Sequence, residues 1–141
     1  MNALLIEQIT VHEGFRAFKY HCTADKETIG YGFNIEAGIS KRCARALLKE
    51  QLAEKHDELV KDISFFNELS EQRQAALINM AFQLGTKGLL GFKKMLAALS
   101  DKDYETAYRE GLNSKWAKSD TPKRAEKVMR QILINEWINP N

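Results

Sequence analysis

Apolar side chains recur at helical spacing along most of the chain. The first dozen residues carry leucine and isoleucine on one face, which predicts an amphipathic helix ending at Gly14. Between Phe15 and Asn34 the pattern changes to aromatic and β-branched residues with glycines, around a polar turn at residues 23–26. This stretch predicts a small β-hairpin or sheet.

Three further helices follow from the same periodicity. Ser40 caps a helix that runs to about Lys61, with leucines on one face and charges on the other, long enough to connect two lobes. Ser70 opens a helix over 73–84 that is apolar on most sides, so we expect it in the middle of the core. A shorter helix is predicted over 92–99.

Two helices complete the chain. Ser100 is the candidate N-cap of a helix over 101–112. Thr121 at the N-cap and Pro122 at the first helical position begin the last helix. The apolar stripe of that helix consists of Val128, Ile132, Leu133 and Trp137. The fold class expected from these elements is α+β, mostly α, with one small sheet.

Composition excludes several classes of protein. The 141 residues contain 21 basic and 19 acidic side chains, a net charge of +2 that is too small to indicate a dedicated nucleic-acid binder. Cys22 and Cys43 are too few for a disulfide framework and are expected to be free thiols in a cytosol. The short apolar run after Met1 predicts neither a secretory signal nor a membrane anchor.

Metal and nucleotide sites are not predicted. The three histidines show no ligand spacing with one another or with the cysteines, and neither HExxH nor CxxC occurs. Gly30-Tyr31-Gly32 lacks both the third glycine of a dinucleotide fingerprint and the lysine of a phosphate loop. We therefore expect no cofactor.

Glu13 is a candidate general acid. It ends the first helix where the hairpin folds back, and desolvation there would raise the pKa of its carboxyl group towards the value that an acid catalyst needs. An ordinary solvated carboxylate at a helix end is the alternative.

The predicted strand from Thr28 to Phe33 has two different faces. Thr28, Gly30 and Gly32 share one face, and the aromatic and isoleucine side chains on the other face are expected in the core. A hydroxyl beside two positions without side chains fits the floor of a cleft in which a sugar chain could approach the backbone. An equal alternative is that the glycines serve only to bend the strand.

These residues resemble the phage-type lysozymes, glycoside hydrolase family 24. The family motif is Glu, eight residues, Asp, five residues, Thr, then Ile-Gly-Tyr/Ile-Gly, and Glu13, position 22 and Thr28 keep that spacing. A second block over 76–85, followed by Gly91-Phe92 and by 116–124, occurs in family order. The region 34–39 is shorter than the sheet of the T-even relative, so a reduced β-lobe is expected.

Position 22 departs from the motif, because Cys22 stands where most of the family has aspartate. A free thiol near pKa 8.5 is only a few per cent ionised at neutral pH unless its surroundings stabilise the thiolate. Cys22 could then act as a base or as a nucleophile, or it could be a small core residue. Asp25 and Glu27 are nearby carboxylates that could substitute, although a solvated turn suits them better.

The resemblance also implies further site residues. Gly30, Asn79, Phe82 and Gln83 correspond to positions that line the cleft in relatives, although Phe82 alone would read as core. Arg124 corresponds to the arginine that pairs with the catalytic glutamate. Its place in the first turn of a helix, where the dipole disfavours a cation, is consistent with an anionic partner. A solvated surface arginine is the commoner alternative.

The resemblance implies a bilobed lysozyme domain over residues 1–141. A small β-lobe occupies about 14–40, a bridging helix 41–61, and a helical lobe 1–13 together with 62–141. Its expected role is that of an endolysin that hydrolyses the β-1,4 bond between N-acetylmuramic acid and N-acetylglucosamine in peptidoglycan, with Glu13, Cys22 and Thr28 as catalytic residues.

The expected setting of this activity is also implied by the resemblance. The chain would be a monomer without stable membrane insertion, would wait in the host cytoplasm until a holin opens the inner membrane, and would then reach the cell wall. Two alternatives are a non-catalytic wall-binding module derived from a lysozyme and a helical protein-interaction domain, for instance a fragment of a phage tail.

Overall fold

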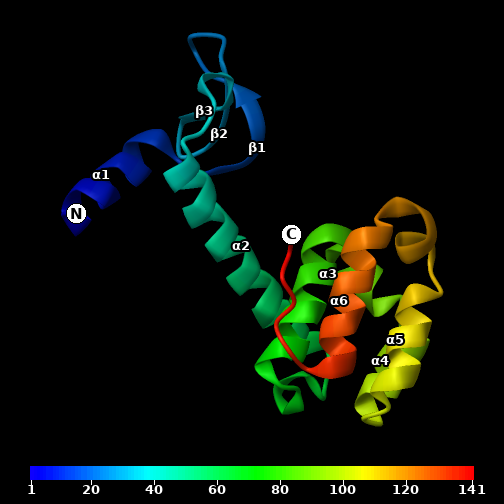
Figure 1. Ribbon diagram of the computed structural model, residues 1–141. Helices are drawn as coiled ribbons and strands as arrows, with labels where there is room; N and C mark the ends of the chain where they lie inside the picture. The colour runs from blue at the N-terminus through cyan, green and yellow to red at the C-terminus, as the bar shows by residue number, and fades with distance from the viewer. The chain divides into compact units, whose positions relative to one another are not determined.

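The computed structural model describes residues 1–141 and divides the chain into two compact units, Met1–Leu47 and Leu48–Asn141. Six α-helices and one three-stranded sheet make up most of it (Figure 1). The expected mostly helical α+β fold class is thereby confirmed. The assignment of residues 1–13 to the helical lobe stays a prediction, as do the other lobe boundaries.

The first unit contains helix α1 (Ala3–Glu13), strands β1 (Arg16–His21), β2 (Glu27–Gly30) and β3 (Phe33–Asn34), and a 3-10 turn at Ile35–Ala37. The Asn2 side chain caps α1, and Gly14 ends it at a φ of 71°. The strands form an antiparallel sheet in the order β1-β2-β3. The helix and the hairpin agree with the sequence.

The strand expected from Thr28 to Phe33 is instead two strands joined by a tight turn. Gly30 and Gly32 have φ of 68° and 77°, a region that only glycine adopts easily, and Ile29 pairs with Phe33 across the turn. The prediction of a core face was wrong, because Phe33 is 62% exposed whereas Thr28 is 3% exposed. Thr28 is the one buried residue of this unit.

Helix α2 (Lys41–Asp62) begins as predicted, with the Ser40 hydroxyl accepting from the amide of Cys43 at 3.2 Å. Beyond it lie a 3-10 turn at Phe66–Glu68 and helices α3 (Glu71–Leu90), α4 (Lys93–Ser100), α5 (Tyr104–Leu112) and α6 (Pro122–Ile134), with a π-helical turn at Trp116–Asp120. Helix α5 contacts α4 and α6, and α6 also contacts α3 (Figure 1).

Helix α3 is the central helix that the sequence predicts, but it extends further. Ser70 caps it as expected, and the chain stays helical beyond Gly85, where a φ of 79° introduces a kink. The buried apolar residues of the protein lie between Leu59 and Ile132, so the second unit holds the hydrophobic core. Four of the largest, Leu77, Met80, Leu99 and Met129, come from α3, α4 and α6.

Three details of the later helices differ from expectation. Ser100 is the last residue of α4 rather than the cap of α5, which begins at Tyr104 with Asp103 as its N-cap. The reason is a turn at residues 101–102, in which Lys102 has a φ of 60°. Trp137 does not continue the stripe of α6, because Asn135 adopts the left-handed conformation that ends this helix, and Trp137 is 59% exposed.

None of the helices combines the length and the apolar character that a membrane span needs.

Candidate active site

Cys22 and Thr28 lie together at the tip of the β1–β2 hairpin. The amide of Cys22 donates to the carbonyl of Lys26 at 3.0 Å, and the amide of Asp25 donates back to the carbonyl of Cys22 at 2.8 Å. These bonds close the turn, and the Thr28 hydroxyl, which donates to the Lys26 carbonyl at 2.9 Å, is within hydrogen-bond reach of the thiol. The first unit thus brings together two of the three predicted catalytic residues.

The turn stabilises the ionised form of Cys22. Hydrogen bonding from the backbone at Lys26 and then at Ala24 lowers the pKa of Cys22 below its ordinary value. Desolvation opposes this effect, and the Thr28 hydroxyl adds a lowering that is smaller than the effect of desolvation. The side chain is half-buried rather than enclosed in a core. Because Thr28 has a single hydroxyl proton, it can donate either to the Lys26 carbonyl or to the thiolate.

Glu13 ends α1 beside the turn between β2 and β3. A Cβ atom added at Gly32 would lie 2.8 Å from Cδ of Glu13 and closer still to its Oε2, so the carboxylate packs against the backbone of Gly32. Glu13 is exposed overall. The sequence predicts that the Glu13 carboxyl group is desolvated, and packing against Gly32 does not by itself remove it from water.

Gly32 is a residue whose role the sequence reasoning missed. Its lack of a side chain leaves room for Glu13, and its φ of 77° turns the chain back into β3. The signal is the pair of glycines at 30 and 32, which alternation places on one face of a continuous strand. Gly30 has a different neighbour, because a Cβ there would meet the Phe33 ring at 2.9 Å. Its predicted contact with substrate stays a prediction.

The two carboxylates considered as substitutes for Cys22 are engaged elsewhere. Asp25 pairs with His21 at 3.2 Å, and its side chain is 92% exposed. Glu27 pairs with Lys19 at 3.3 Å. Asp25 fits the solvated turn expected of it, whereas that expectation was wrong for Glu27, which is the half-buried first residue of β2.

In the second unit, a groove of about 440 Å³ lies between residues of α2, α3 and α6. Leu48, Leu52 and Ile78 contribute to its apolar lining, beside Phe82, which is 41% exposed and so is not plain core. Asn79 and Arg124 are its polar members. The groove thus contains three of the four site residues predicted in this unit.

Arg124 is held by Asn79. Its Nε and Nη2 donate to Oδ1 of Asn79 at 3.0 and 2.8 Å, and Nη2 also donates to the Asn79 carbonyl at 3.3 Å. The partner of Arg124 in this unit is thus a neutral amide, which leaves the positive charge unneutralised. Its pairing with Glu13 stays a prediction.

Gln83 does not line this groove, because both ends of its amide are used inside the unit. Its Oε1 accepts from the Trp116 indole at 2.9 Å, and its Nε2 donates to the Thr121 hydroxyl at 3.3 Å. The Thr121 side chain accordingly does not cap α6. Gln83 joins α3 to the π-helical turn and to the start of α6. Its role in the structure is therefore to hold these three elements together.

No group of three or more potential ligand side chains is placed to hold a metal ion.

The chain is similar to proteins of one family along most of its length. A family model described as phage lysozyme matches residues 10–133. The pre-baseplate central spike protein Gp5 of Enterobacteria phage T4 is 43% identical over 65 residues, which are 46% of this chain and 11% of that protein.

Two proteins of Dictyostelium discoideum are also similar. Probable T4-type lysozyme 2 is 38% identical over 66 residues, 47% of this chain and 38% of its own length. Probable T4-type lysozyme 1 is 35% identical over 69 residues, 49% of this chain and 40% of its own length. The aligned part of the chain therefore spans less than half of each of these relatives.

Proposed function

The chain belongs to the phage lysozyme family, and from this premise we propose that it hydrolyses the β-1,4 bond between N-acetylmuramic acid and N-acetylglucosamine in bacterial peptidoglycan. The observation that carries the proposal is the grouping of Cys22 with Thr28 in a turn that favours the thiolate, at the motif spacing from Glu13. With cysteine in place of aspartate, the site has a base only if the thiol is ionised, and a turn that stabilises the thiolate provides that base.

In the proposed mechanism, protonated Glu13 donates its proton to the glycosidic oxygen as the bond to the anomeric carbon breaks. Its position against Gly32 fixes the carboxyl group at the end of α1. The proposal includes an ion pair of Glu13 with Arg124, whose charge is not neutralised by Asn79.

On the opposite face of the sugar, the Cys22 thiolate removes a proton from a water molecule while Thr28 holds that water through its hydroxyl oxygen. The water oxygen then attacks the anomeric carbon, and the configuration inverts. The competing route has the sulfur itself attack, which gives a thioglycosyl intermediate that water later hydrolyses with net retention. The anomer released, followed by proton NMR, decides between the two routes.

The apolar groove in the second unit offers a surface for sugar rings. Phe82 provides an apolar face, and Asn79 provides a polar edge beside it. Gly30 is the residue of the first unit that we propose contacts the glycan, beside the Phe33 ring that packs against it.

The decisive experiment measures new reducing ends released from purified peptidoglycan. Glu13→Gln should reduce the rate by about 100-fold or more, the usual contribution of a general acid. Glu7→Gln is the matched control, since Glu7 lies on the same helix with an exposed side chain, and it should keep wild-type activity. Full activity of Glu13→Gln would overturn the assignment, and inactivity of the wild-type chain would favour a non-catalytic wall-binding module.

Iodoacetamide tests the cysteine separately. Cys43 is exposed, so Cys43→Ser provides a background in which alkylation reports on Cys22 alone. Complete modification should abolish turnover, and unchanged turnover would make Cys22 a bystander.

In a cell, the proposed role is that of an endolysin. The chain acts as a monomer, stays in the host cytoplasm until a holin opens the inner membrane, and then reaches the wall and causes lysis. Expression alone should leave cells intact, and chloroform should then cause rapid lysis.

A second candidate role is the same hydrolysis within a phage particle. The similarity to the T4 protein named as a pre-baseplate central spike protein favours it. This role requires that a phage encodes the chain, and mass spectrometry of purified particles of that phage separates the two roles, because only a particle component would be found there.

A further inference from the structure

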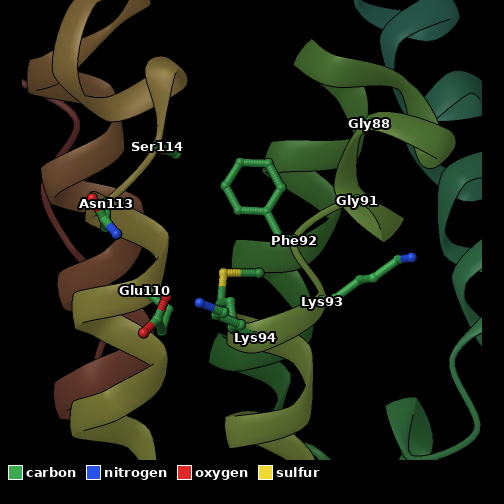
Figure 2. Close-up of a pocket in the computed structure, with 9 residues that line it drawn as sticks. Gly88, Gly91, Phe92, Lys93, Lys94, Glu110, Asn113 and Ser114 are labelled. Carbon is green, nitrogen blue, oxygen red and sulfur yellow. The ribbon is translucent and has the colours of Figure 1, made fainter.

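A second hollow in the helical unit lies away from the groove just described. It has a volume of about 490 Å³, within the range of about 300 to 1,000 Å³ of small-molecule pockets. One wall comes from the end of α3 and the start of α4, and the other from the end of α5 (Figure 2). Its lining residues are distinct from those of the Asn79–Arg124 groove.

Two opposite charges face this pocket without pairing. Figure 2 shows the Lys94 side chain extending from α4 towards the side of α5 that carries Glu110. Neither residue takes part in the ion pairs of the protein, nor in any of its side-chain hydrogen bonds. Glu110 is half-buried as a residue, and its carboxylate has no protein partner.

The other polar groups of the pocket are already engaged. The Asn113 side-chain oxygen accepts from Lys118 at 2.6 Å, and the Ser114 hydroxyl donates to the carbonyl of Gly111 at 2.7 Å. The Lys93 side chain points away from the pocket in Figure 2. Lys94 and Glu110 are therefore the charged groups that remain free to bind a ligand.

The wall that carries Lys94 is suited to a carboxylate. Helix α4 begins directly after Phe92 without a side-chain cap, so the N–H groups of its first turn add positive potential beside the lysine. The Phe92 ring, which also lines the pocket, is held by an edge-to-face contact with the Trp116 ring, with 5.9 Å between the ring centroids. This ring gives the pocket a rigid apolar face.

We propose that this pocket binds a zwitterionic group of the amino-acid type, with its carboxylate on Lys94 and its ammonium on Glu110. Two sources carry this chemistry, namely a free amino acid and the amino-acid residues of a peptidoglycan stem peptide. The second source rests on the proposed function, and it would make the pocket a site that recognises the peptide attached to the glycan.

Binding is tested on the full chain by amide-resolved NMR titration with diaminopimelate. Signals of residues 88–95 and 110–114 should shift, whereas acetate and ethylammonium, each with one charge only, should bind at least tenfold more weakly. Lys94→Gln and Glu110→Gln should each weaken diaminopimelate binding at least tenfold.

Matched controls exist on the same helices. Lys93→Gln removes the same charge from the neighbouring residue that points away, and Glu105→Gln removes an exposed carboxylate from α5 outside the pocket. Neither should change the affinity. The double variant Lys94→Glu with Glu110→Lys should recover binding only in part, because a zwitterion can bind in the reversed direction but its ammonium then meets the positive potential at the start of α4.

Three results would overturn the proposal. They are the absence of shifts with diaminopimelate, equally tight binding of acetate, and equal effects of Lys93→Gln and Lys94→Gln. An inactive chain would refute the proposed function and leave this NMR measurement intact, so the two failures are distinguishable.

The source of the ligand is identified by activity. If it is the stem peptide, Lys94→Gln should lower the rate on intact peptidoglycan and have no effect on glycan strands stripped of peptides by an amidase. If it is a free amino acid, the variant should lose diaminopimelate binding and cleave both substrates at the wild-type rate.

Discussion

At the scale of single residues, the chemistry at position 22 depends on the backbone around it. Amides of Lys26 and Ala24 and the hydroxyl of Thr28 supply hydrogen bonds that an aspartate at this position would not need in order to ionise. The turn therefore compensates in part for the higher intrinsic pKa of a thiol. The compensation has a measurable consequence for pH dependence.

A base must be deprotonated, so activity is lost as the pH falls through the pKa of Cys22. That pKa is lowered but starts from a thiol, whereas aspartate titrates near 3.9. In Cys22→Asp, the acidic limb of the profile of kcat/KM against pH should move to lower pH by more than about one unit. Cys22→Ser should lose about 100-fold or more in kcat, and Cys43→Ser should change neither quantity. An unmoved acidic limb would contradict a role for Cys22 as base.

Gly32 makes a second residue-scale prediction. Alanine there would adopt a strained φ and would push against the Glu13 carboxylate, so kcat/KM should fall at least tenfold. Gly38→Ala is the control, because Gly38 has nearly the same φ, 76°, and nothing within 4 Å of an added Cβ. Both variants should lose about 1 kcal/mol of stability in thermal unfolding from the strain alone. Equal kcat/KM in the two variants would show that Glu13 does not need the space.

At the scale of elements, side-chain hydrogen bonds at the N-cap determine where a helix begins more strongly than the hydrophobic periodicity of the sequence does. Asp103 accepts from the amide of Thr106 at 3.1 Å and from its hydroxyl at 2.6 Å. These bonds start α5 three residues later than the position expected from Ser100. The Thr106 hydroxyl and then its amide also lower the pKa of Asp103.

Removal of this cap should destabilise the protein in a pH-dependent way. Asp103→Ala should lower the Tm by a few degrees at neutral pH, whereas Ser100→Ala should leave it nearly unchanged. Since the pKa of Asp103 is lowered on folding, its contribution is present above the unfolded-state pKa of about 4 and is lost as the pH falls through the folded-state value. The Tm difference from wild type should therefore shrink under strongly acidic conditions. Equal effects of the two substitutions in calorimetry would restore Ser100 as the cap.

Much of the secondary structure was predictable because its signals are local. Ser40, Ser70, Gly14 and Pro122 mark helix ends through bonds or backbone angles of their own neighbourhood. The reversal at Gly30 and Gly32 was not predictable from alternation, since a glycine pair permits either a strand or a turn.

The candidate site also combines features that local sequence signals predict with features that depend on distant residues. The spacing of Glu13, Cys22 and Thr28 is visible in the sequence, and two of the three meet in one turn. The partners of Gln83 are not visible, because Trp116 and Thr121 lie 33 and 38 residues away along the chain. The pocket between α4 and α5 depends in the same way on packing between separate helices.

At the scale of the whole molecule, the apolar core is distributed unevenly. Every buried hydrophobic side chain belongs to the second unit, and the first unit buries only Thr28. Hydrogen exchange should reflect this asymmetry. Amides of β1 and β2 should exchange much faster than those of α3 and α6 under native conditions. Equal protection of the sheet and of these helices would contradict the asymmetry.

Glu13, Cys22 and Thr28 lie in the unit without a hydrophobic core. Loss of the proposed activity and unfolding of the second unit should therefore occur at different temperatures. A warm sample should stop cleaving its substrate at temperatures where calorimetry still finds the helices intact, and it should regain activity on cooling. Loss of the proposed activity on heating would then report the thermal stability of the hairpin and of α1, while the main heat-absorption peak would report the unfolding of the second unit.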